Sequence, residues 1–173
     1  LQDLDLGGKK VFLRLDLNVP VKNGVIKDDT RIREALPTVK YILERTNKVA
    51  IASHLGRPDG EVDLNYSLEP VGVRLAELLG KEVVFVNDYM KEPYDQVLGQ
   101  IDSDQFVLLE NLRFNSGETK NDLEFSRQLA KGIDFYVNDA FGTAHRAHAS
   151  TVGVAELLDP PKRAAGFLME KEI

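Results

Sequence analysis

The chain has 173 residues, no cysteine and a net charge of −6, with 43% hydrophobic and 29% charged residues. This length and balance are typical of one globular domain, and the lack of cysteine excludes disulfides and cysteine-ligated metal centres. The acidic charge argues against general binding to nucleic acid or a membrane surface, and no apolar run approaches the roughly 18 residues of a membrane helix.

Short apolar runs, rich in β-branched and aromatic residues, alternate along the chain with segments of helical periodicity. Most of these runs lack alternation of polar and apolar residues, as expected of strands that are buried on both faces. The predicted strands are Val11–Leu15, Val49–Ala52, Val83–Val86, Phe106–Leu109, Phe135–Val137 and Ala164–Leu168.

Capping residues mark the helices between these strands. Asp28-Asp-Thr30 offers caps for a helical turn at Arg31. Pro37 is expected to start a second segment that runs to about Arg45, because proline is tolerated only in the first turn of a helix. Two further helices are predicted, one between a Ser67 cap and Gly80, the other from Asn121 to about Lys131.

The alternation of strands and helices predicts a doubly wound, Rossmann-like α/β domain. Its sheet has six parallel strands, and helices cover both of its faces. In such folds, ligands bind outside the carboxyl ends of the strands, so the residues that follow the strands are the candidates for function.

Cations gather at these strand ends although the whole chain is acidic. Arginine presents a planar fork of donors that suits phosphate and carboxylate oxygens. Several cations that converge from different strands suit a small ligand with more than one negative charge. The segments after the second, fourth and fifth strands contain all three histidines and three arginines: His54, Arg57, Arg113, His145, Arg146 and His148.

Asp16 and Asn18, which follow the first strand, fit a hydroxyl group better than a bare phosphate, so the ligand is expected to be a small phosphorylated hydroxy acid. Each arginine, taken singly, is also compatible with a solvated or structural role. Arg14, inside a strand, is expected to form a buried or half-buried ion pair. For His54, two readings stay open: a neutral histidine that orients its loop, or a direct ligand contact.

Other ligand-binding motifs are missing. The chain has no P-loop, no glycine-rich dinucleotide fingerprint after the first strand and no nucleophile elbow. A metal held by His145 and His148 is disfavoured, because Arg146 lies between them and Asp139 is the only evident third ligand.

Five segments of the chain, in order and with matching spacing, closely resemble the phosphoglycerate kinase family. The resemblance extends over the whole chain. The segments are Arg14-Leu-Asp-Leu-Asn-Val-Pro20, Asp28-Asp-Thr-Arg-Ile-Arg33, Ser53-His-Leu-Gly-Arg-Pro58, Leu109-Glu-Asn-Leu-Arg-Phe114 and Asn138-Asp-Ala-Phe-Gly-Thr-Ala-His-Arg-Ala-His-Ala-Ser150.

The resemblance implies a glycolytic enzyme of two domains that transfers a phosphoryl group between ATP and 3-phosphoglycerate, giving ADP and 1,3-bisphosphoglycerate. Residues 1–173 are similar to the amino-terminal domain, which holds the phosphoglycerate. The carboxy-terminal domain, which holds ATP or ADP with Mg²⁺, is absent from this chain, so we expect a piece of a longer protein that binds no cofactor and has no turnover alone. We also expect a cytoplasmic monomer.

The resemblance also implies roles for individual residues. One pair contacts the hydroxyl and carboxylate region of the glycerate, one arginine lies near the transferring phosphoryl group and acts in catalysis, and a clamp holds the phosphate end. Position 17 is leucine where the family often has an aromatic residue. The pair is Asp16 and Asn18, the catalytic arginine is Arg31, the clamp is His54, Arg57, Arg113 and Arg146, and His148 belongs to the same basic patch.

Two other classes of function are alternatives to this one. A stand-alone α/β anion-binding module of the receiver type needs acidic residues after the first and third strands and a lysine after the fifth. Asp16 and Asn87-Asp88 meet the first condition, but Asn138-Asp139 stands where the lysine is needed. A metal hydrolase that uses the histidines is disfavoured, because the chain has too few metal-ligating residues near them.

Overall fold

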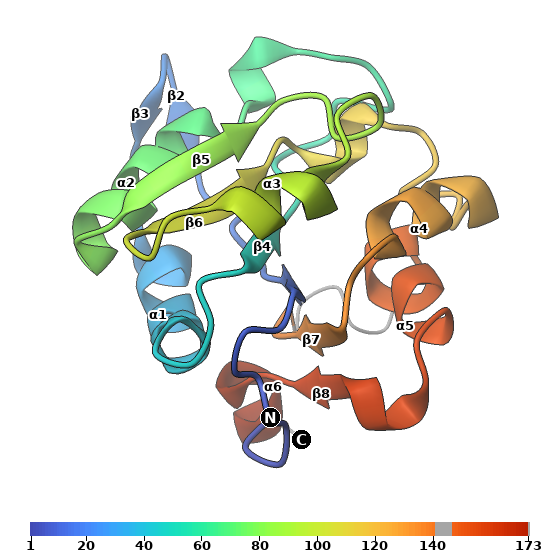
Figure 1. The fold of residues 1–173 in the computed structure, drawn as a ribbon. Helices are drawn as coiled ribbons and strands as arrows, with labels where there is room; N and C mark the ends of the chain where they lie inside the picture. The colour runs from blue at the N-terminus through green and yellow to red at the C-terminus, as the bar shows by residue number, and fades with distance from the viewer. Residues whose placement is uncertain (141–146, 173) are drawn as a thin grey trace.

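The central element of the fold is a sheet of six parallel strands in the order β5-β6-β4-β1-β7-β8 (Figure 1). The computed structural model describes residues 1–140 and 147–172. The order confirms the predicted doubly wound arrangement, since strands lie on both sides of β1. On one side, the chain passes from β4 to the edge strand β5 and then returns to β6 between them. The strands are β1 Val11–Arg14, β4 Val49–Ala52, β5 Glu82–Val86, β6 Gln105–Leu109, β7 Phe135–Asn138 and β8 Arg163–Ala165.

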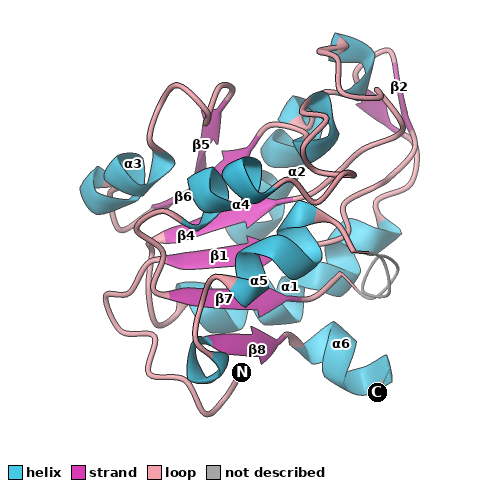
Figure 2. Ribbon diagram, turned by 90° about the vertical axis from the view of Figure 1, so that its right-hand side faces the viewer, coloured by secondary structure: helices cyan, strands magenta, loops and turns pink. Residues whose placement is uncertain are grey.

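Helices lie on both faces of this sheet, and Figure 2 shows α4 and α5 in front of it with α1 behind. The α-helices are α1 Thr30–Leu43, α2 Glu69–Leu79, α3 Tyr94–Gln100, α4 Leu123–Ala130, α5 Val154–Glu156 and α6 Phe167–Glu172. Shorter helical turns are η1 Leu64–Tyr66, η2 Leu112–Phe114, η4 Ala149–Gly153 and η5 Pro160–Lys162.

The two faces of the sheet build two separate hydrophobic clusters. In β1, Leu13 packs into the cluster beneath α1 and α2, whereas its neighbour Phe12 packs into the cluster beneath α3, α4 and α5. Both side chains are fully buried. Successive side chains of a strand point to opposite faces, so burial on both sides requires the unbroken apolar runs seen in the sequence.

Helix α1 differs from the prediction, because it continues through Pro37 as one helix. Ile32, Ala35, Val39 and Ile42 form a buried stripe on both sides of the proline, and their packing keeps the helix in register. Pro37 itself lies on the exposed side, so the hydrogen bond that it cannot donate is lost where water can replace it.

Three other differences concern segment boundaries and short elements. The last strand ends at Ala165, and Phe167 and Leu168 begin α6 instead of extending the strand. A hairpin of β2 Val21–Lys22 and β3 Val25–Ile26, and helix α3, were not predicted. These elements have two to seven residues, too few to show a clear period.

Of the predicted caps at two helices, Gly80 is confirmed, whereas the N-cap of α2 is Leu68 in place of Ser67 and that of α4 is Asp122 in place of Asn121. Gly80 ends α2 in the left-handed conformation, with φ of 63°, and the Asp122 carboxylate accepts a hydrogen bond from the Phe125 amide at the start of α4. In the described part of the chain, no helix combines the length and apolar character that crossing a membrane requires.

Candidate functional site

The candidate site is built from loops that follow four neighbouring strands. In the order β6-β4-β1-β7, the strands lie side by side and point the same way. Their following loops carry Arg113, His54 with Arg57, Asp16 with Asn18, and the segment that leads to His148. The fold therefore brings residues from distant parts of the sequence to one edge of the sheet.

Buried polar side chains hold these loops against one another. The Asn18 Oδ1 accepts from the Gly56 amide at 3.0 Å, and the Ser53 Oγ accepts from the Leu17 amide at 2.9 Å. The Asn111 amide group donates to the Leu55 carbonyl at 2.7 Å and accepts from the Arg113 amide at 3.0 Å. These bonds fix the β4 loop between its neighbours on either side.

A small cavity of about 200 Å³ brings together three of the predicted clamp residues, Arg57, Arg113 and His148. Arg57 is exposed, whereas Arg113 and His148 are buried, and the Arg113 NH1 donates to the Gly56 carbonyl at 3.4 Å. Such a hollow has the size and the donors for a phosphate group. Asp59, Gly60 and Thr119 complete the lining, while Arg146 and His145 lie outside the described residues.

Arg31 and Asp16 form a second part of the site. Arg31 lies in the first turn of α1, and its guanidinium turns back to the loop after β1. Its NH1 donates to both Asp16 carboxylate oxygens at 3.0 Å and to the Asn18 carbonyl at 3.3 Å. The physical reason is charge, because Asp16 offers the exposed cation a carboxylate.

His54 lies at the end of β4, only 4% exposed. Its Nδ1 lies 2.9 Å from the NH2 of Arg14, which is fully buried. Burial, followed by the positive charges of Arg14, Arg113, His148 and Arg31, lowers the pKa of His54 far below its ordinary value of 6.5. The imidazole is therefore neutral at physiological pH.

The ion pair expected for Arg14 is present, although its partner was not predicted. The Glu118 carboxylate lies 4.0 Å from the Arg14 guanidinium, and both side chains are fully buried. Glu118 also accepts from the amide and hydroxyl of Ser150, at 2.8 and 2.5 Å. Nothing local in the sequence signals this contact, because Glu118 lies in a loop 32 residues before Ser150.

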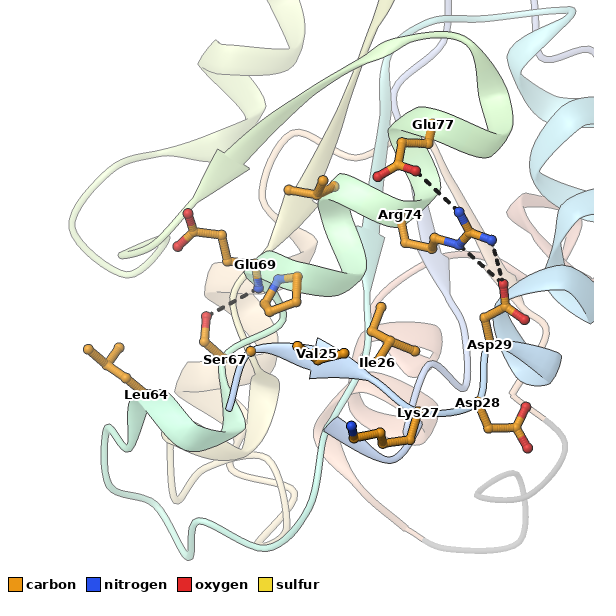
Figure 3. Close-up of a pocket in the computed structure, with 13 residues that line it drawn as sticks. Val25, Ile26, Lys27, Asp28, Asp29, Leu64, Ser67, Glu69, Arg74 and Glu77 are labelled. Carbon is orange, nitrogen blue, oxygen red and sulfur yellow. Dashed lines mark hydrogen bonds and ion pairs between the residues drawn. The ribbon is translucent and has the colours of Figure 1, made fainter. Parts of the chain in front are cut away.

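A larger cavity, with a volume of about 930 Å³, lies elsewhere, between the β2–β3 hairpin and α2 (Figure 3). Its charged lining has four carboxylates and two cations. One of these cations, Arg74, is bonded to Asp29 at 2.9 Å and to Glu77 at 3.2 Å (Figure 3). An anionic lining of this kind does not suit a multiply charged anion, so size alone does not identify the site.

Comparison with known proteins supplies the family. The sequence model described as "Phosphoglycerate kinase" matches residues 1–173. The chain belongs to the phosphoglycerate kinase family. It is 52% identical to the phosphoglycerate kinase of Fervidobacterium nodosum over 173 residues, which is all of this chain and 42% of that protein. It is 54% identical over 174 residues to phosphoglycerate kinase 3, cytosolic, of Arabidopsis thaliana, covering 43% of it.

Solved structures of phosphoglycerate kinases share the fold. The structure of the enzyme from Coxiella burnetii superimposes with a TM-score of 0.86 at 42% identity, over 99% of this chain and 42% of that one. The chain thus spans about two-fifths of the length of the phosphoglycerate kinases that it matches. The family assignment made from the five segments is confirmed, and so is the fold class.

One glycine of the chain provides a test of loop geometry. Gly56, between His54 and Arg57, has φ of +61°, and a Cβ there would lie 2.4 Å from the Tyr66 ring. Gly80 has a similar φ of +63° with no atom within 4 Å. Alanine at either position should lose about 1–2 kcal/mol of unfolding free energy from the left-handed backbone, but Gly56→Ala should lose more because the ring must move.

Chemical denaturation of the two glycine variants measures this difference. Gly80→Ala is the matched control, since it has the backbone strain without the steric contact. Equal losses for Gly56→Ala and Gly80→Ala would show that the loop yields freely at Tyr66.

Proposed function

We propose that residues 1–173 form the phosphoglycerate-binding domain of a phosphoglycerate kinase, the amino-terminal one, and that another domain holds the nucleotide. The observation that carries this proposal is the cavity in which Arg57, Arg113 and His148 meet at the carboxyl edge of the sheet. The ligand would be 3-phosphoglycerate or 1,3-bisphosphoglycerate, with its phosphate in this cavity. Arg146 completes the clamp in the proposal, although it lies outside the described residues.

The other end of the ligand would lie near Asp16, Asn18 and Arg31. The carboxylate of Asp16 can accept a bond from the glycerate hydroxyl. Arg31 uses only NH1 in its contacts with described residues, so its remaining donors can meet a carboxylate or a transferring phosphoryl group. The carboxylate of the ligand attacks the phosphoryl group directly, so the protein supplies position and charge and no nucleophile.

The complete reaction of the family also needs a nucleotide and a metal ion. Among the described residues, no group of three or more histidine, aspartate or glutamate side chains is arranged so that it could hold a metal ion, so we derive no step through Mg²⁺. We propose that ATP or ADP with Mg²⁺ binds the other domain, and that this chain alone has no turnover. We further propose a cytoplasmic monomer; the relatives include both cytosolic and chloroplastic enzymes.

Calorimetric titration tests the proposed function. 3-Phosphoglycerate should bind to this chain, more weakly as salt increases because the contacts are between charges, whereas ATP and ADP should give no appreciable heat. Arg113→Ala should weaken binding by about 1.5–3 kcal/mol, the usual contribution of a charge-assisted hydrogen bond, or on the order of ten- to a hundredfold.

Arg45→Ala is the matched control, because it removes the same charge at the opposite end of the sheet. Arg45 lies four residues before β4 begins, and its guanidinium stacks on the Tyr41 ring at 3.5 Å. Binding of MgATP without 3-phosphoglycerate, or equal affinity losses for Arg113→Ala and Arg45→Ala, would contradict the assignment.

A further inference from the structure

The guanidinium of Arg14 occupies the centre of a buried polar cluster beneath the site. Its Nε donates to the Ser150 hydroxyl at 2.8 Å, its NH1 donates to the Leu15 carbonyl, and its NH2 lies 2.9 Å from the Nδ1 of His54. The Arg14 side chain is completely inaccessible to solvent. It therefore has no contact with the ligand space and acts only through its neighbours.

The chemistry of arginine decides which nitrogen of His54 carries the proton. A guanidinium has only donors and no acceptor, and its intrinsic pKa above 12 keeps it protonated even though burial lowers the pKa of Arg14. In the NH2–Nδ1 contact, the imidazole must therefore be the acceptor. A neutral ring that accepts at Nδ1 carries its proton on Nε2.

The charges around His54 oppose a second proton. Arg14 faces it from β1, Arg31 from α1, Arg113 from η2 and His148 from the start of η4, and all of these lower its pKa. The buried carboxylate that pairs with Arg14, Glu118, is also bonded to Ser150. A charged His54 imidazole would therefore add another positive charge to this group of cations, and, in the described part of the chain, no carboxylate would be left to pair with it.

We propose that Arg14 is a positioning residue that fixes His54 as an uncharged imidazole with its proton on Nε2, which leaves that N–H as a donor for the anionic ligand. Arg57 and Arg113, which line the same cavity, repel each other in the free protein. A neutral donor adds a hydrogen bond without increasing this repulsion. The identity of the ligand rests on the proposed function, whereas the state of the imidazole does not.

Nitrogen-15 NMR of the ligand-free chain tests the state of the imidazole. Long-range ¹H–¹⁵N correlations distinguish protonated from unprotonated ring nitrogens, and a His54→Gln variant assigns the signals. The wild-type ring should show the Nε2–H pattern without titration at pH values on both sides of the ordinary histidine pKa of about 6.5. A proton on Nδ1, a mixture of tautomers or titration near 6.5 would overturn the inference, whether or not any variant folds.

The role of Arg14 is tested by removing both buried charges together. Arg14→Met combined with Glu118→Gln leaves no unpaired buried ion, so we expect this double variant to fold. Arg14→Ala alone would leave the Glu118 carboxylate buried without its partner and is expected to be much less stable. In this double variant, His54 should show mixed tautomers and titrate closer to 6.5. Ser150→Ala is the control, because it removes a partner of Arg14 but leaves the contact with His54. Persistence of the wild-type pattern in the folded double variant, or its loss in Ser150→Ala, would overturn the role of Arg14.

Binding of 3-phosphoglycerate adds a functional measurement. The ligand phosphate titrates near pH 6, but this change is common to both proteins. The ratio of the two dissociation constants therefore reports only the titration of groups in the protein. Between about pH 7.5 and 5.5, the affinity of the double variant should rise relative to wild type by about threefold or more, as His54 gains a charge. A ratio independent of pH contradicts the positioning role. Failure of the wild type to bind 3-phosphoglycerate would contradict the proposed function. It would not affect the NMR test of the imidazole, which uses the ligand-free chain.

Discussion

Glu118→Ala should lower the free energy of unfolding by about 3–5 kcal/mol, the usual effect of removing one partner of a buried ion pair. The Glu118 side chain is fully buried beside Arg14. Without the carboxylate, Arg14 stays charged in the interior, and the amide and hydroxyl of Ser150 lose their acceptor. Urea denaturation followed by circular dichroism measures the loss.

Glu124→Ala is the matched control for Glu118→Ala. Glu124 pairs with Arg127 at 3.9 Å, but the two side chains are 71% and 61% exposed, so water replaces the lost partner and stability should hardly change. The combined change of Arg14 to methionine and Glu118 to glutamine should recover much of the loss, because no charge is then left unpaired. A loss for Glu118→Ala no larger than that for Glu124→Ala would mean that water reaches Arg14.

The sheet, and the edge of it at which the candidate residues lie, could be predicted from the sequence because both follow from local patterns. An unbroken run such as Val49–Ala52 has to be buried on both faces, and all four of its residues are. The rule that ligands bind beyond the carboxyl ends of parallel strands then selects the residues that follow the strands, with Arg57, Arg113 and His148 among them, without knowledge of any contact. The structure places these three around one cavity.

The parts that were not predicted depend on contacts between distant residues. Ser150 lies 136 residues from Arg14, and no spacing rule connects them. Arg31 turns back to Asp16 because a carboxylate from another element lies within reach. Pro37 stays inside α1 because packing of the helix against the sheet outweighs a local preference of about 3 kcal/mol. Each of these is decided by tertiary structure rather than by local sequence.

In a complete enzyme, in which this chain is joined to its nucleotide-binding domain, Arg31→Ala should lower kcat by about 10²–10³-fold. This is the usual effect of losing one donor that stabilises charge in a transition state. KM for 3-phosphoglycerate should change much less. The reason is that Arg31 is 52% exposed and anchored to Asp16 through NH1 alone, which leaves donors for charge that develops as the phosphoryl group moves.

Arg57→Ala and Arg146→Ala should show the opposite pattern, a raised KM with kcat largely kept, because the proposed clamp holds the phosphate that does not react. Arg33→Ala is the control on the same helix as Arg31. Its guanidinium is 54% exposed and bonded to Asp29 at 3.1 Å, away from Asp16, so both constants should stay close to wild type. Steady-state kinetics of the four variants decide between the roles. A raised KM with intact kcat for Arg31→Ala would make Arg31 one more ground-state ligand, and its assignment to catalysis would then be wrong.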